Sequence, residues 1–164
     1  MLFNNLAIAE RENDEFIIQY RGTLSEFKHF KFYQIPWEMT FVDGHFNVGQ
    51  LIMLDVIPKC GQWKIDLLGK NGDILFHFNP RFKENCVVRN SYQRGTWSNE
   101  ERSGPFPFEK ERGCELALRN DSHPIMYVNN ECINTFVLGT MNPGKDYVRT
   151  GVYGDVEITN ISVV

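Results

Sequence analysis

The sequence predicts an all-β fold, built as a sandwich or a barrel. Most apolar residues fall in short runs broken by Gly, Asn, Asp and Pro, and many short strands at close spacing are typical of these architectures. Asn71-Gly72 separates two of the runs, and this pair favours a tight hairpin because both residues tolerate positive φ. Residues 76–82 alternate between apolar and polar side chains, which is typical of a strand with one face in a core.

Residues 1–32 precede this pattern and leave two interpretations open. The stretch LAIAERENDEFIIQY can form one helix, or a helical turn followed by a strand. It has no Gly/Ser linker composition and does not repeat later sequence, so residues 1–32 are interpreted as an extension packed on a single domain.

From residue 41 onward we expect strands within nine apolar runs: FVDG, VGQLIMLDVIP, WKIDLLGKNG, DILFHFNPRF, CVVRNSY, CELALRND, IMYVNN, INTFVLG and GDVEITNISVV. Asn129-Asn130 and Gly154-Asp155 are expected to form turns, because both pairs combine residues that favour turns.

The composition is ordinary for one soluble globular domain, with 164 residues, 42% hydrophobic and 23% charged. The net charge of -4 argues against binding to nucleic acid or to an anionic membrane surface, both of which favour a basic face. No window reaches the roughly 18 apolar residues of a transmembrane helix, so we expect no membrane insertion. The start, MLFNNLAIAERENDE, lacks the basic and apolar regions of a signal peptide, which favours a cytoplasmic protein.

Cysteine and histidine spacing predicts no metal site. The four cysteines have no C-x-x-C spacing and are expected to be free thiols in strands: Cys60, Cys86, Cys114 and Cys132. His29, His45 and His123 are scattered and are expected on the surface. We expect neither a metal nor a cofactor.

Polar side chains occupy alternate positions of one predicted strand. His77, Asn79 and Arg81 share one face of the extended chain, while Phe76 and Phe78 share the other. If CVVRN pairs alongside, Asn90 projects from the same surface. The strand therefore presents long hydrogen-bonding groups opposite a core face.

An aromatic residue and two charged residues follow. Trp97 comes after a loop-like segment, and Glu100 and Arg102 share a face because they are two positions apart. We name the whole set the polar plate: His77, Asn79, Arg81, Asn90, Trp97, Glu100 and Arg102.

The chemistry of the polar plate suits a sugar. Arg offers a rigid fork of donors, Asn and neutral His offer donors and acceptors, and Glu only accepts, so together they match hydroxyls that both donate and accept. Trp supplies a flat apolar surface for the C–H face of a pyranose ring. A network of Arg81, Glu100 and Arg102 would order these side chains before the ligand arrives.

The polar plate resembles the carbohydrate-recognition domain of the galectins, which are β-galactoside-binding lectins. The family pattern His-x-Asn-x-Arg, Val-x-Asn, Trp-x-x-Glu-x-Arg is matched by His77-Phe78-Asn79-Pro80-Arg81, Val88-Arg89-Asn90 and Trp97-Ser98-Asn99-Glu100-Glu101-Arg102. The resemblance extends over residues 33–164 and implies a jelly-roll-like sandwich of two antiparallel sheets, related to the concanavalin fold.

The chain departs from the family pattern in places. Ser98 stands where Gly is usual, and Val128-Asn129-Asn130 stands where Val-Asn-Gly is common. The loop FKENC after Arg81 is short, which can alter contacts with the sugar beyond galactose. Residues 1–32 lie outside the resemblance.

The resemblance implies a role for each residue of the polar plate. His77, Asn79 and Arg81 bind the axial 4-hydroxyl of galactose, with Arg81 near the ring oxygen. Asn90 and Glu100 bind the 6-hydroxyl, and Trp97 stacks on the ring. Three side chains reach the adjoining glucose or N-acetylglucosamine: Arg81, Glu100 and Arg102.

Three classes of function compete. The first is a non-catalytic lectin that binds lactose-type glycans on glycoproteins or glycolipids, with export by a leaderless route as the resemblance implies. The second is a glycosidase, which needs two facing carboxylates; Glu100 and Glu101 point to opposite sides of a strand. The third is a galectin-fold protein that binds another protein and no sugar, and such a protein would be expected to have lost part of the plate.

Two features stay open. Gln62, Lys64 and Asp66 are expected on the ligand side by their alternation, where they either extend the groove or form plain surface. Cross-linking glycans requires two sites, from a homodimer or a second domain, because one domain supplies one.

Overall fold

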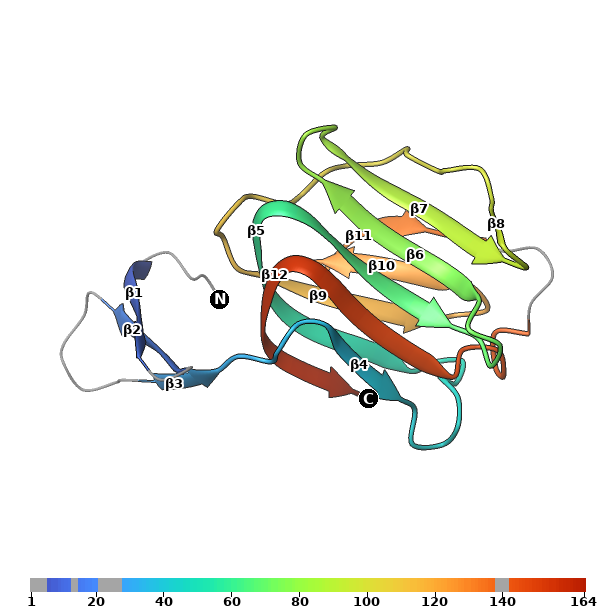
Figure 1. Cartoon of the computed structure of the whole chain (residues 1–164), viewed down its shortest axis with the longest axis horizontal. Coiled ribbons are helices and arrows are strands. Elements are labelled where there is room, and N and C mark those ends of the chain that lie inside the picture. The colour runs from blue at the N-terminus through green and yellow to red at the C-terminus, as the bar shows by residue number, and fades with distance from the viewer. Residues whose placement is uncertain (1–5, 13–14, 21–27, 138–141) are drawn as a thin grey trace.

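Two long strands, β5 (Leu51–Leu68) and β12 (Arg149–Val163), lie side by side and organise the sheets in the computed structural model (Figure 1). The structure describes residues 6–12, 15–20, 28–137 and 142–164, and within these ranges all regular structure is β-strand. The predicted all-β class is confirmed. No helix in the described ranges is long and apolar enough to cross a membrane.

The sheet curls into two layers because β5 and β12 both bend and contribute one half to each. The first layer holds β9 (Cys114–Asn120), β10 (Pro124–Val128) and β11 (Glu131–Thr135) beside the first half of β5 and the second half of β12. The second layer holds the other halves with four further strands, β4 (Trp37–Thr40), β6 (Ile74–Arg81), β7 (Cys86–Gln93) and β8 (Thr96–Trp97). β4 pairs with β12, β6 with β5, β7 with β6 and β8 with β7.

The bend depends on a close contact between the two long strands. A Cβ on Gly154 would lie 2.3 Å from the carbonyl oxygen of Gln62, and Gly154 has φ of +93°, so only glycine fits. The Gly61 amide donates to Asp155 Oδ2 across the bend at 2.6 Å. The prediction of a turn at Gly154-Asp155 is therefore wrong, since both residues form a bulge inside β12.

Two other predicted turns are confirmed. Gly72, with φ of +83°, lies in the hairpin between β5 and β6. Asn129 and Asn130 have φ of +49° and +68° between β10 and β11, which is the conformation expected of a two-residue hairpin.

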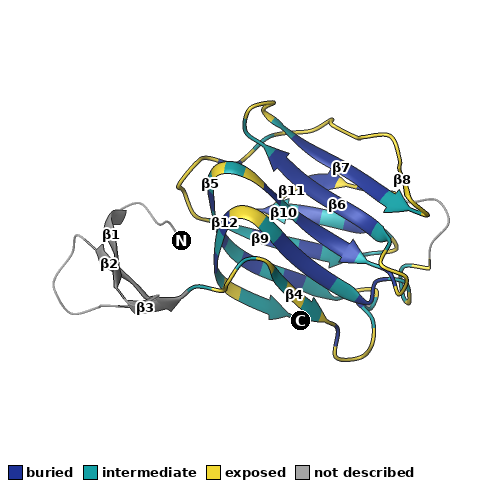
Figure 2. Ribbon diagram, in the orientation of Figure 1, coloured by how far each residue is buried: buried dark blue, intermediate teal, exposed yellow. Residues whose placement is uncertain are grey.

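A core fills the space between the layers, and the strands that enclose it are largely buried (Figure 2). Alternate residues of β5 and β6 contribute to it, including Trp63, Ile65, Phe76 and Phe78. The opposite faces of these two strands are left for polar groups, as the alternation in residues 76–82 predicts.

The described residues of the N-terminal segment form strands, so the interpretation as one helix is wrong, and the second interpretation is correct in its strand but not in its helical turn. β1 (Leu6–Glu12), β2 (Glu15–Tyr20) and β3 (Lys28–Lys31) make a three-stranded antiparallel sheet in that order. The Ala and Glu residues of β1 favour a helix, but pairing with the Phe- and Ile-rich β2 outweighs that propensity.

Candidate functional site

One face of the second layer brings the polar plate together. Antiparallel pairing sets His77 opposite Asn90 and Asn79 opposite Val88, so β6 and β7 project Asn90 and the three β6 residues to the same side. β8 pairs with β7 and places the Trp97 ring 5.1 Å from the His77 ring and 5.2 Å from the Tyr92 ring. Trp97 remains 46% exposed, so part of the indole is open to a ligand.

A bulge returns Glu100 to the side of the plate. Ser98 pairs with Ser91, and the next backbone pair joins Arg89 to Glu101, so Asn90 lies opposite two residues. Trp97 and Glu100 are three positions apart and would face opposite sides of a regular strand. With the bulge, both contact the plate, since Trp97 packs on His77 and Glu100 binds Arg81.

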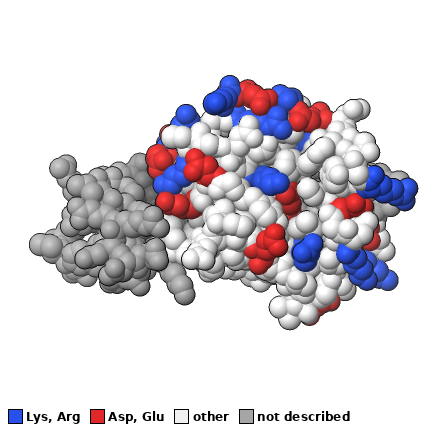
Figure 3. All heavy atoms as spheres, viewed as in Figure 1, with Lys and Arg blue, Asp and Glu red and all other residues white. Residues whose placement is uncertain are grey.

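Four charged side chains form a closed ring at one end of the plate. Arg81 donates to Glu100 at 3.0 Å and to Glu84 at 3.3 Å, and Arg102 donates to both carboxylates. The hydrogen bonds from Arg102, followed by those from Arg81, lower the pKa of the Glu84 and Glu100 carboxyl groups below their ordinary value. Basic and acidic groups are interspersed at this end of the molecule (Figure 3).

The ring contains the predicted network of Arg81, Glu100 and Arg102, together with a carboxylate that sequence reasoning missed. Glu84 lies in the short loop between β6 and β7, three positions after Arg81. The spacing alone did not announce the contact, because the conformation of the loop decides whether these two charges meet.

Arg81 links the charged ring to the rest of the plate. Its Nε donates to Asn79 Oδ1 at 2.7 Å, and with the bonds to Glu84 and Glu100 this uses three of the five N–H donors of a guanidinium. Two donors are left for a ligand. Asn79 is held from its other end, because Nδ2 donates to the Trp63 carbonyl oxygen at 2.6 Å.

Asp66 sets the chemistry of the His77 ring. Asp66 Oδ1 lies 2.6 Å from His77 Nδ1, and Asp66 is only 2% exposed. A carboxylate can only accept, so Nδ1 carries a proton, and whenever the ring carries only that proton Nε2 offers a lone pair. Asp66 thus lies on the ligand side, as its alternation predicts, but below the surface, where it orients His77.

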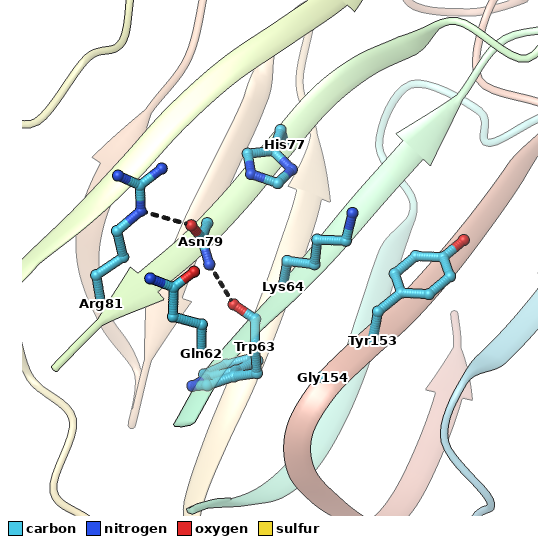
Figure 4. A pocket seen from close by; sticks show the side chains of 8 residues that line it. All are labelled: Gln62, Trp63, Lys64, His77, Asn79, Arg81, Tyr153 and Gly154. Atoms are coloured by element: carbon cyan, nitrogen blue, oxygen red, sulfur yellow. Dashed lines mark hydrogen bonds between the residues drawn. The ribbon is translucent and has the colours of Figure 1, made fainter. Parts of the chain in front are cut away.

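A groove of about 390 Å³ continues from the plate over β5 and β12 (Figure 4). His77, Asn79 and Arg81 line it together with Gln62 and Lys64. Figure 4 shows Lys64 extending between His77 and the far wall of the groove.

Tyr153 forms that far wall, and sequence reasoning missed it. Lys64 Nζ lies 5.0 Å from the centre of the Tyr153 ring, and Glu38 accepts a hydrogen bond from the Tyr153 hydroxyl at 2.7 Å. Tyr153 is two positions from Gly151 on the same face, and its ring lies over that glycine, where no Cβ would fit. The only signal for Tyr153 in the sequence was an aromatic residue next to Gly154, in a strand with one polar face.

No group of three or more His, Cys, Asp or Glu side chains that could hold a metal is present in the part of the chain that the structure describes. The four cysteines lie in β5, β7, β9 and β11 as free thiols.

The chain is similar to known proteins over most of its length. The family model "Galactoside-binding lectin" matches residues 36–163. A 32 kDa beta-galactoside-binding lectin of Haemonchus contortus is 37% identical over 136 residues, which cover 81% of this chain and 47% of that protein. The protein of the same name from Caenorhabditis elegans is 38% identical over 136 residues, covering 81% of this chain and 48% of its own. This chain therefore spans about half the length of these relatives.

A solved structure has the same fold. The crystal structure of Caenorhabditis elegans galectin LEC-6 matches with a TM-score of 0.73 and 27% identity, covering 81% of this chain and 93% of that one. The two-layer sandwich expected from the sequence is thus found in an experimentally determined relative.

Proposed function

The chain belongs to the galactoside-binding lectin family, and on that premise we propose that it binds terminal β-galactosides of the lactose and N-acetyllactosamine type without catalysing a reaction. The observation that carries the proposal is the assembly of seven side chains on one open face, four of which (Asn79, Arg81, Glu100 and Arg102) are joined by hydrogen bonds before any ligand is present: His77, Asn79, Arg81, Asn90, Trp97, Glu100 and Arg102.

The plate supplies complementary partners for one axial hydroxyl. His77 Nε2 accepts, and the free donors of Arg81 lie on the same face of β6, with Asn79 between the two residues. A 4-hydroxyl placed between them donates to His77 and accepts from Arg81. Trp97 then covers the C–H face of the same ring.

Catalysis is disfavoured by the charge state of the plate. A glycosidase needs a carboxylic acid with a raised pKa to protonate the leaving oxygen. The carboxyl groups of Glu84 and Glu100 have lowered pKa values because two arginines bind them, so both remain ionised and neither serves as the acid.

The alternative, a protein-binding module without sugar binding, has little surface to use. Protein interfaces favour a buried apolar centre. Trp97 is the only member of the plate among the exposed large hydrophobic residues, and in the described ranges the others are scattered over loops and the C-terminus.

The groove beyond the plate is proposed to contact a sugar linked to the galactose. Gln62, Lys64 and Tyr153 line it, and they offer an amide, an ammonium and an aromatic surface. Asp66 does not line it, because its carboxylate is committed to His77 and to Lys64.

The proposed partners are galactose-containing glycans on glycoproteins or glycolipids. We further propose a cytoplasmic protein that reaches these glycans by a route independent of a signal peptide. Cross-linking of glycans would need a homodimer or a second domain, since one plate binds one glycan.

Lactose is expected to bind with a dissociation constant on the order of 10 µM to 1 mM, because an open plate leaves much of the disaccharide in water. Isothermal titration calorimetry with the folded chain checks this, with sucrose as the control sugar. Absence of heat with lactose at millimolar concentration would reject the lectin function.

Trp97→Ala is expected to weaken lactose binding by about 1 to 3 kcal/mol, because it removes the stacking surface. The fold should be retained, since Trp97 lies outside the core cluster. Tyr33→Ala, which removes an exposed aromatic side chain from a residue whose backbone pairs with Ile158 of β12, is the matched control and should leave the affinity unchanged. Equal affinities of Trp97→Ala and wild type would show that the indole does not contact the sugar.

A further inference from the structure

Asn90 is held by two donors, one from its own strand β7 and one from the segment that follows β8. Its Oδ1 accepts a hydrogen bond from the Ser91 backbone N–H at 2.8 Å and another from the Ser98 hydroxyl at 2.6 Å. Ser91 Oγ lies 3.0 Å from Ser98 Oγ, so Ser98 can accept from Ser91 while it donates to Asn90. The three side chains form a short hydrogen-bond relay between β7 and the segment that follows β8.

This relay decides which end of the Asn90 amide faces a ligand. A backbone N–H can only donate, so the atom next to it is the oxygen, and both lone pairs of that oxygen are occupied. Asn90 is 4% exposed, and Nδ2 makes no hydrogen bond within the described part of the chain. Nδ2 is also absent from the buried polar atoms that lack a partner, so it reaches the surface of the plate.

Glu100, next to Asn90, supplies hydrogen-bond acceptors to complement the Nδ2 donor. Its carboxylate only accepts, and the bulge places it opposite Asn90 on the same segment as Ser98. A hydroxyl between Asn90 and Glu100 would accept from Nδ2 and donate to the carboxylate. The Ser98 bond ties Asn90 to the segment that carries Glu100, and so sets the spacing of this donor and acceptor.

We propose that Ser98 is a positioning residue for specificity: its hydroxyl locks the Asn90 amide so that Nδ2 donates to the 6-hydroxyl of a bound galactose. This inference rests on the proposed galactoside binding. Without the Ser98 hydroxyl, Asn90 keeps only the local bond to Ser91, and its side chain must be ordered by the ligand at an entropic cost.

The test compares lactose with lactose that lacks the 6-hydroxyl of its galactose, titrated against wild type, Ser98→Ala and Ser98→Thr. Ser98 is exposed, so both variants should fold. Ser98→Ala is expected to weaken lactose about 3- to 10-fold, the range of one neutral hydrogen bond, and to change the deoxy sugar less than about 2-fold. Ser98→Thr keeps the hydroxyl and should bind both sugars as wild type does.

Thr135→Ala, which removes an exposed hydroxyl on β11 in the other layer, is the matched control. Equal weakening of both sugars by Ser98→Ala would overturn the proposal, because the serine would then only stiffen the segment. So would unchanged lactose binding by Ser98→Ala, or a threonine variant as weak as the alanine variant. Failure of the wild type to bind lactose is a different result, which rejects the proposed function itself.

Discussion

Arg81→Ala is expected to abolish measurable lactose binding while the fold survives. Arg81 has two donors free for a ligand, and hydrogen bonds to a charged group contribute about 1.5 to 3 kcal/mol each. The substitution also releases Asn79 Oδ1 and Glu100, which Arg81 binds at 2.7 and 3.0 Å. A site that binds lactose only weakly would then fall below the detection limit of calorimetry.

Three measurements make the Arg81 result specific. Thermal unfolding should show a folded variant, because the side chain lies on the plate and not in the core. Arg81→Lys should be weaker than wild type but stronger than alanine, since an ammonium keeps the charge and loses the planar fork. Arg112→Ala removes an arginine paired with Glu109 in an exposed loop and should bind normally. A folded Arg81→Ala variant within about tenfold of the wild-type affinity would contradict the central role of Arg81.

The parts of the site that lie on regular strands could be predicted from the sequence. Strand alternation is strict, so His77, Asn79 and Arg81 had to share a face. Antiparallel pairing of consecutive strands then brought Asn90 opposite His77. The hairpins at Gly72 and Asn129 were predictable for a similar reason, because their backbone conformations favour particular residues.

The parts that depend on loops or on distant pairing could not be predicted. Glu84 reaches the two arginines through the conformation of a short loop, and Glu100 reaches the plate through a bulge that no residue type announces. Tyr153 approaches Lys64 only because β12 pairs with β5 from the far end of the chain. At the N-terminus, local helix propensity competed with pairing between β1 and β2, and pairing prevailed.

Arg89 illustrates how burial can depend on such long-range contacts. Its alternation placed it away from the ligand face, which is correct, but the structure also buries it to 3% exposure. There its guanidinium donates to the carbonyl oxygens of Val87 and Ser103, and it lies 3.7 Å from Glu101. These contacts hold the segment that carries Glu100 and Arg102 in place from the side opposite the plate.

Lactose is expected to bind and cellobiose is not, within the range that a titration detects. The two disaccharides share the reducing-end glucose and the β1–4 linkage, and differ only in whether the terminal 4-hydroxyl is axial or equatorial. His77 and Asn79 are buried, and their orientations are set by Asp66 and by the Trp63 carbonyl. The plate therefore cannot easily turn its polar groups toward an equatorial hydroxyl.

An equatorial 4-hydroxyl would leave those groups unpaired on a face from which the sugar has excluded water. Each unpaired group costs roughly 1 to 3 kcal/mol, and more when it is charged, as Arg81 is. Two such losses correspond to at least about a 30-fold difference in affinity, while the C–H surface offered to Trp97 is similar in both sugars. Titration of both disaccharides under identical conditions measures the difference, and N-acetyllactosamine, which keeps the axial hydroxyl, should behave like lactose. Equal affinity for lactose and cellobiose would mean that His77, Asn79 and Arg81 do not recognise the 4-hydroxyl, and the assignment of these residues would be wrong.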